Sequence, residues 1–318
     1  MRKLLLVAIL SFFISSLNGQ VNFWDYYKDL NGWKKFSVKW DNDIAFQTDR
    51  YYTNGLEFEY HDQRLQHLYP SRFLFNPFET SESIYSLTLT HHIFTPKVFI
   101  IPPGTIDRPF SSYLLLGFKA MNLSSENRAA WTSELRVGLM GKYAGGELVQ
   151  NSIHKMLPAS EPVPGWNTQI DHDVCIDYQV KFEKEIFAMK YVAAEGLAKG
   201  TLGVPYTNFG AGLRLKAGLF PDAFSKLGFF DNTSWNMFTF IDACVLASVY
   251  DATLQGGAFN QKNHYTLQDI NVFVGEMDFG ISGKWKALSA GIGGSLRTPR
   301  FQEGLPHRWG YIEFGYIF

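Results

Sequence analysis

Apolar and polar side chains alternate with a period of two along much of this chain. Residues 56–61 read Leu-Glu-Phe-Glu-Tyr-His, which places apolar or aromatic groups on one face of an extended segment and charged or polar groups on the other. Residues 131–139 follow the same rule, with Trp131 and Val137 on one face and Arg136 on the opposite face. Alternation of this kind indicates β-strands with one apolar and one polar face.

The same pattern along the whole chain predicts about twelve strands, an even number as expected for a single-chain bacterial outer-membrane barrel. The last segment keeps Ile312, Phe314 and Tyr316 on the face of the terminal Phe318, which resembles the C-terminal strand of bacterial outer-membrane proteins. Closure into a barrel would remove the exposed edges of such a sheet. The predicted strands are 35–43, 51–62, 83–91, 110–121, 128–141, 172–185, 187–200, 205–218, 235–249, 267–281, 285–296 and 308–318.

The composition agrees with a membrane barrel. The 318 residues include 28 Phe, 16 Tyr, 8 Trp and 28 Gly, yet the mean hydropathy is only -0.11. After the N-terminal segment there is no stretch of the roughly 20 apolar residues that a transmembrane helix needs. We therefore predict an all-β fold, a transmembrane antiparallel β-barrel with a polar lumen. The net charge of -1 gives no indication of nucleic-acid binding, and Cys175 and Cys244 allow at most one disulfide.

The N-terminus has the form of a secretory signal peptide. Two basic residues, Arg2 and Lys3, precede an apolar run from Leu4 to Ile14, and small residues follow before Gln20. The apolar run is too short to span a bilayer as a helix. We expect cleavage after Gly19, so that residues 1–19 form the signal peptide and residues 20–318 form the outer-membrane β-barrel domain.

The predicted topology places most polar clusters on the outer side of the membrane. If the mature N-terminus is periplasmic, the first strand rises outward, and the connections 44–50, 92–109 and 142–171 are extracellular. The connection from Gln63 to Glu82 is an exception, because it would be a long periplasmic turn where short turns are normal.

The first polar cluster lies at the turn after the first strand and comprises Asn42, Asp43, Asp49, Arg50, Thr53 and Asn54. Asn42 and Asp43 end that strand, and Thr53 lies early in the next one, so the side chains can face each other across a hairpin. A carboxylate, an amide oxygen and backbone carbonyls suit Ca²⁺. The alternative is a solvated turn in which Asn and Asp satisfy local backbone groups.

A second cluster predicts a short helix within an extracellular loop. Apolar residues recur with helical spacing between the glycine pair at 145–146 and Pro158. Gln150 and His154 are four residues apart and share a face. A neutral histidine can take a proton from water, and a carboxylate such as Glu161 could hold its ring in the required tautomer. The alternative is a helix that packs over the barrel mouth, with His154 merely polar.

A third segment, Asp107-Arg108-Pro109, places an arginine at a strand top, where it could bind a phosphate or carboxylate of a lipid headgroup. An ordinary turn with proline after arginine is the alternative. The chain has neither a Gly-x-Ser-x-Gly elbow nor a His-Glu-x-x-His zinc motif. His91 and His92 are adjacent, which places their rings on opposite strand faces, unrelated to a metal site.

Together, these segments resemble the outer-membrane lipid A 3′-O-deacylase family over most of the mature chain. The resemblance rests on the Asn42-Asp43 turn, on Tyr52-Thr53-Asn54-Gly55, on Asp107-Arg108-Pro109, and on Gln150-x-x-x-His154 followed by Pro164-Gly165-Trp166. It implies a twelve-stranded barrel that uses Ca²⁺ to remove the 3′-linked acyloxyacyl group of lipid A near the outer-leaflet rim. The expected partner is lipid A of the lipopolysaccharide in the bacterial outer membrane, and the expected state is a monomer.

The resemblance also implies roles for individual residues. His154 matches the catalytic histidine and would act as a general base, and Glu161, after a one-residue shift, would align it. Asn42 and Thr53 would orient ligand or substrate, and Asp43 would bind the metal, although Ile44 follows it where a further carboxylate could serve. The substrate-binding residues would be Arg108 and Gln150.

Two other functions fit parts of the sequence. A non-catalytic barrel, either a channel or a surface-binding protein, would explain the strands and the lumen charges. An outer-membrane phospholipase would need a serine nucleophile beside a histidine. Ser152 lies two residues from His154 on the predicted helix, so these two side chains do not face each other.

Overall fold

The computed structural model describes residues 34–43, 46, 48, 50–97, 106–156, 163–220, 224, 235–260 and 262–318. Twelve strands form a closed antiparallel barrel in which β12 pairs with β1. The predicted fold class and strand number are confirmed, whereas the predicted signal peptide lies outside the described residues. The strands are β1 (Lys35–Asn42), β2 (Tyr51–His61), β3 (Glu82–Thr95), β4 (Ser111–Ser124), β5 (Ala129–Met140), β6 (Asp173–Ala188), β7 (Val192–Gly203), β8 (Tyr206–Leu219), β9 (Trp235–Asp251), β10 (Phe273–Trp285), β11 (Leu288–Arg297) and β12 (His307–Ile317).

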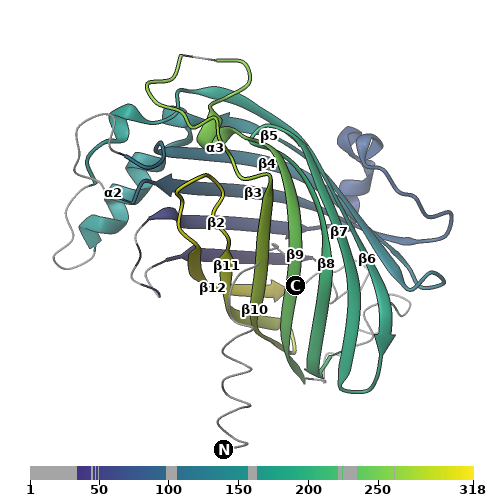
Figure 1. Cartoon of the computed structure of the whole chain (residues 1–318). Helices are drawn as coiled ribbons and strands as arrows, with labels where there is room; N and C mark the ends of the chain where they lie inside the picture. Colours follow the sequence, from purple (N-terminus) through teal and green to yellow (C-terminus); the bar gives the residue numbers. More distant parts are fainter. Residues whose placement is uncertain are drawn as a thin grey trace, which may run out of the picture.

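Short helices occupy the connections at both ends of the barrel. They are η3 (Gln63–His67), η4 (Tyr69–Phe73), η5 (Gly141–Ala144), α2 (Gly146–Met156), η6 (Trp166–Thr168) and α3 (Ala252–Gln255). The sequence predicted α2 within one residue at each end. In Figure 1, α2 lies at one end of β3 and β4, and the blue turns of η3 and η4 lie at the opposite end. No helix in the described ranges is both long and apolar enough to cross a membrane.

The outer face of the wall carries the apolar half of the alternation. Its exposed side chains include Val137, which is 46% exposed, and Leu202, which is 72% exposed. Residues with this exposure would be costly in water but suit the hydrocarbon region of a bilayer. Similar outward positions on other strands are Leu116, Ile176, Ile241, Ile292 and Phe314.

Paired charged side chains line the lumen, because strand register places oppositely charged residues next to each other. Arg136 faces Asp177 across β5 and β6, with nitrogen–oxygen distances of 2.9 and 2.8 Å. Arg214 faces Asp242 across β8 and β9, with distances of 2.9 and 3.1 Å. Cross-strand neighbours on one face are close enough to interact directly, so the inward half of each strand pattern becomes an ion-pair network.

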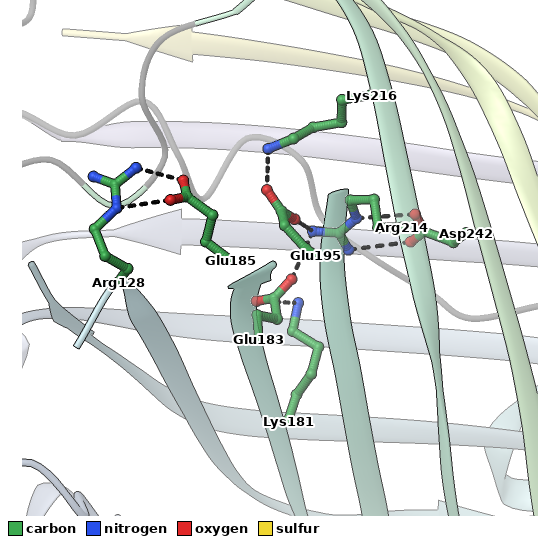
Figure 2. Close-up of polar contacts among 8 residues, drawn as sticks. All are labelled: Arg128, Lys181, Glu183, Glu185, Glu195, Arg214, Lys216 and Asp242. Carbon is green, nitrogen blue, oxygen red and sulfur yellow. Dashed lines mark hydrogen bonds and ion pairs between the residues drawn. The ribbon is translucent and has the colours of Figure 1, made fainter. Parts of the chain in front are cut away.

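Arg214, which is fully buried, is the centre of an ion-pair cluster in the lumen (Figure 2). Besides Asp242, its guanidinium contacts Glu183 at 2.7 Å and Glu195 at 3.0 Å. Lys181 pairs with Glu183 at 3.1 Å, and Lys216 pairs with Glu195. The cluster therefore contains three cations and three carboxylates, so its charges balance. Charged groups that are removed from water need such pairing because their desolvation is costly.

Strand boundaries depart most from expectation at β10, which begins at Phe273 rather than at residue 267. Leu267 and Ile270 pack instead against a buried rim cluster of Tyr51, Leu254 and Phe301. These two apolar residues therefore belong to the rim of the barrel and not to a strand of its wall. The two cysteines, Cys175 and Cys244, are both buried and free, so the possible disulfide is absent from the described residues.

Candidate functional site

A polar patch lies on the outer face of the wall at the end that bears α2. Strand register places Asn42 opposite Asn54, and Asn54 opposite Ile93. His92 lines the lumen, so its neighbours Ile93 and His91 point outward. Asn54 is nevertheless only 4% exposed, and Ile93 is fully buried. Outward polar groups at this level are therefore covered by another part of the chain.

The cover is formed by the connection from η5 through α2 to η6. Ile93 packs with Phe110, Val163 and Trp166, and Val149 of α2 lies against this cluster. Burial of these large side chains outside the barrel holds the helix on the wall, since each fully buried apolar side chain contributes roughly 1.5–3 kcal/mol.

Polar contacts and a close approach fix the start of α2. His91 Nε2 lies 2.9 Å from the carbonyl oxygen of Ala144, and Ser112 Oγ donates to the carbonyl of Gly141 at 3.3 Å. A Cβ atom at Gly146 would lie 2.5 Å from Ser112 Cβ. Only glycine therefore lets the helix begin this close to the strand.

Thr53 lies at an irregularity in β2. The pairing with β3 shifts between Tyr52 and Asn54, so Thr53 is the extra residue of a β-bulge. Its side chain is buried, and Thr53 Oγ1 lies 3.5 Å from the carbonyl oxygen of Ile93. A bulge re-aims a side chain that regular alternation would send to the other face. This geometry brings Thr53 next to the Ile93 backbone.

Asp43 directly follows β1 and is buried, with 2% of its surface exposed. Its Oδ2 atom accepts hydrogen bonds from Thr48 Oγ1 at 2.8 Å and from the backbone N–H of Arg50 at 2.9 Å. The carboxylate therefore ties the β1–β2 turn together. Asp49, which belongs to the same predicted cluster, lies outside the described residues.

Gln150 and His154 lie on successive turns of α2, as their spacing predicted. Gln150 is buried, and its Oε1 atom accepts a hydrogen bond from Trp166 Nε1 at 2.9 Å. Its Nε2 atom is also buried and has no hydrogen-bond partner within the described ranges. His154 is half-buried. Glu161, the predicted partner of His154, lies outside the described residues.

Arg108 lies apart from the patch that contains Asn42, Thr53 and Asn54. It lines the lumen cavity, its guanidinium lies 4.8 Å from the Phe94 ring centroid, and it donates to the carbonyl of Thr253 at 3.0 Å. Burial lowers the pKa of Arg108 to about 10 despite the nearby Asp251 carboxylate, so the guanidinium keeps its charge at neutral pH. Its contacts hold α3 at the mouth of the barrel, on the inner side of the wall.

The lumen cavity is a separate feature with a volume of about 240 Å³. Its wall includes ionisable and aromatic groups such as Glu57, His92, Tyr113 and Arg136. His92 lies within it, 3.2 Å from Glu57 Oε1 and 2.5 Å from Tyr113 Oη. The adjacent histidines therefore face opposite sides of the wall, as predicted.

The oxygen donors of the patch fit a hard cation better than a soft one. Asn42, Asp43 and Thr53 offer an amide, a carboxylate and a hydroxyl, which are ligand types that Ca²⁺ takes together with backbone carbonyls. Within the described ranges, no group of three or more His, Cys, Asp or Glu side chains could hold a metal ion. No assembled metal site is therefore shown in that part of the chain, and the patch offers only donor types that calcium also takes.

Sequence reasoning placed Asn54 in the first polar cluster but missed a second contributor to the patch, His91. Strand alternation contained the signal, because both occupy outward positions where apolar residues such as Leu89 are found farther along the wall. A polar side chain in a lipid-facing position near a rim indicates that something covers it. Only the fold reveals that α2 is the cover.

Comparison with known proteins assigns the chain to a class and a family. The family model "LpxR: Outer membrane protein LpxR" matches residues 5–318. The solved structure "LpxR from Salmonella typhimurium" is 21% identical, with a TM-score of 0.71, and the match covers 89% of this chain and 100% of that chain. The β domain of the Bordetella autotransporter BrkA is 10% identical with a TM-score of 0.47, covering 91% and 99%. No curated protein sequence matches the chain.

The closed barrel and the family match define an outer-membrane β-barrel enzyme of the ester hydrolase class. The chain belongs to the LpxR family of outer-membrane lipid A deacylases.

Proposed function

We propose that this protein is a Ca²⁺-dependent esterase that removes the 3′-linked acyloxyacyl group of lipid A in the outer leaflet, with His154 as the general base. The observation that carries the proposal is the covered patch on the outer wall. Strand register groups Asn42, Thr53 and Asn54 beside Ile93, and Val149 of α2, the helix that carries Gln150 and His154, packs against the Ile93 cluster. A lipid moving laterally in the outer leaflet would meet polar groups and a proton acceptor at this position.

The helix supplies the groups that hydrolysis of an ester requires. A neutral imidazole at His154 would take a proton from water as the water attacks the ester carbonyl, and Glu161 would hold the ring in the matching tautomer. Gln150 Nε2, which is buried and has no partner within the described ranges, would donate to a substrate oxygen. Because Trp166 holds Gln150 Oε1, the amide would already be oriented before the lipid binds.

Calcium would be held by Asp43, with Asn42 and Thr53 contributing oxygen donors or orienting the substrate. Bound there, it would supply electrostatic stabilisation of the negative charge that develops on the ester oxygen. Asp43 is buried and accepts two hydrogen bonds from its own turn, which supports a carboxylate fixed in one orientation.

Asp43→Asn is therefore expected to weaken calcium binding by about 10–100-fold or more, because it removes the charged ligand of the proposed site. The measurement is ⁴⁵Ca²⁺ binding to the folded protein in detergent, together with a titration of activity against free calcium. Glu303→Gln is the control, because Glu303 is an exposed residue on the same rim. Equal calcium binding by both variants would remove Asp43 from the metal site.

Ser152→Ala is expected to leave activity at the wild-type level. Ser152 Oγ donates to the carbonyl of Leu148 at 2.6 Å, one helical turn earlier, so the hydroxyl serves the helix backbone and not His154. Rates of fatty-acid release from lipid A and from phosphatidylethanolamine would be measured for both proteins. Complete inactivation by this substitution would favour a serine-dependent phospholipase instead.

The proposal is tested on purified protein in mixed micelles offered lipid A or phosphatidylethanolamine, with calcium or with EDTA. Release of an acyloxyacyl group from lipid A alone, and only with calcium, is the expected result. Calcium-independent release would contradict the metal requirement, and release from the glycerophospholipid alone would contradict the substrate.

A further inference from the structure

The connection between β2 and β3 is much longer than closure of two neighbouring strands requires. It begins at Asp62, whose side chain accepts a hydrogen bond from the backbone N–H of Arg64 at 3.0 Å and so starts η3. Then follow η4 and an extended stretch that leads to β3. Periplasmic turns of outer-membrane barrels are normally short, so this segment calls for a role beyond chain reversal.

The segment runs along the outer surface of the barrel and reaches strands far from its own. Tyr178 Oη of β6 accepts a hydrogen bond from the backbone N–H of Phe75 at 2.8 Å and donates to the carbonyl of Phe73 at 3.0 Å. Ser133 Oγ of β5 donates to the carbonyl of Phe75 at 2.7 Å, and the rings of Phe75 and Trp131 meet edge to face at 5.6 Å.

These strand residues face outward, because their neighbours face the lumen. Arg136 and Asp177 form a buried ion pair inside the barrel, so Tyr178 and Ser133 project from the opposite face. The segment is therefore fastened to the side of the wall that meets lipid. Figure 1 shows the blue turns of η3 and η4 outside the wall, at the end away from α2.

The segment lies at the level of the periplasmic membrane interface. On β5, Trp131 is six residues from the exposed Val137, or about 20 Å along a strand that rises roughly 3.3 Å per residue. The apolar band of such barrels is about 25 Å tall. On β6, the outward positions run from Ile176 through Tyr178 to the exposed Lys184, where a cation first appears among the apolar side chains of this face.

The free side of the segment is aromatic and basic. Tyr69 is 66% exposed, Phe73 is 53% exposed and Phe75 is 57% exposed. Residues 63–78 contain two arginines and a histidine but no carboxylate. The guanidinium of Arg72 lies 5.4 Å from the Tyr69 ring centroid, and no described carboxylate pairs with it. Aromatic rings with adjacent cations are the side chains that anchor proteins at lipid headgroups.

We propose that residues 63–78 form an anchor that binds glycerophospholipids of the periplasmic leaflet. Phe73 and Phe75 would insert among the acyl chains. Their side chains would extend the apolar surface of the adjacent lipid-facing wall. Tyr69 would lie at the glycerol level, and Arg72 would contact a lipid phosphate. The outer-leaflet site beneath α2 takes no part in this interaction, so the anchor stands independently of the proposed enzymatic mechanism.

The test attaches a bimane fluorophore to Phe73→Cys in protein reconstituted into vesicles of phosphatidylethanolamine and phosphatidylglycerol. Quenching by phospholipids brominated in the acyl chain is compared with quenching by aqueous iodide. Val137→Cys is the lipid-facing reference, and Gln302→Cys is the water-facing reference on the opposite rim. Wild type treated with the same label corrects for any reaction at the buried native cysteines.

The anchor predicts that bromolipid quenches the label at position 73 as strongly as at position 137, with protection from iodide. Arg72→Gln in the same labelled protein should reduce bromolipid quenching when phosphatidylglycerol is present. Iodide quenching at position 73 equal to that at position 302 would overturn the proposal. Protection from both quenchers would also overturn it, because a protein partner or a second copy would then cover the segment.

Discussion

His154→Gln lowers kcat for release of the acyloxyacyl group by about 10²–10⁴-fold, which is the usual contribution of a positioned general base. The amide keeps the size and polarity of the side chain but cannot accept a proton at neutral pH. The half-buried position of His154 in the last turns of α2 leaves it room to contact water and substrate. Initial rates at saturating lipid A measure the effect.

Lys155→Gln is the matched control, because Lys155 is the next residue of the same helix and is exposed. Its kcat should equal that of wild type. Both variants should migrate as folded barrels before heating in gel electrophoresis. If the two variants had the same kcat, His154 would not be the base, and the proton acceptor would have to lie elsewhere on the patch.

Arg214→Gln lowers the free energy of unfolding by about 3–5 kcal/mol, the usual cost of removing one partner from a buried ion pair. The guanidinium contacts Asp242, Glu183 and Glu195, all almost fully buried, and its loss leaves their carboxylates close together with less compensating charge. Urea titration of protein folded in detergent, followed by tryptophan fluorescence, measures the change.

Arg128→Gln provides a comparison within the same region of the barrel (Figure 2). Arg128 pairs with Glu185, but its side chain is 34% exposed, so the expected loss is about 0–1 kcal/mol. Equal losses for the two arginine variants would show that burial does not set the strength of these pairs.

Most of the wall was predictable from sequence because strand alternation in a barrel has a single period and two distinct environments. The inward charges and outward apolar residues of β5 and β6 define both faces without reference to any other part of the chain. Prediction failed at the start of β10, where the apolar residues Leu267 and Ile270 were assigned to the strand but pack at the rim. The local sequence pattern indicates that an apolar side chain will be covered, but it does not show which part of the fold covers it.

The candidate site was only partly predictable for the same reason. Spacing alone placed Gln150 and His154 on one helical face, and the hairpin placed Asn42 near Thr53. The seating of α2 on the outer wall depends on the long-range contacts of Trp166 and Ile93, which no local pattern encodes. Arg108 illustrates the limit, since its motif suggested a headgroup contact, whereas its side chain is turned toward the lumen.

Mass spectrometry of lipid A from cells that express the protein would show whether the protein removes the 3′ acyloxyacyl group. Wild type would be compared with His154→Ala, with calcium and with EDTA in the medium, after folded protein is verified in the outer membrane. We expect loss of one acyloxyacyl unit from the 3′ position with wild type and calcium only. Intact lipid A in every sample, or equal loss with His154→Ala, would contradict it.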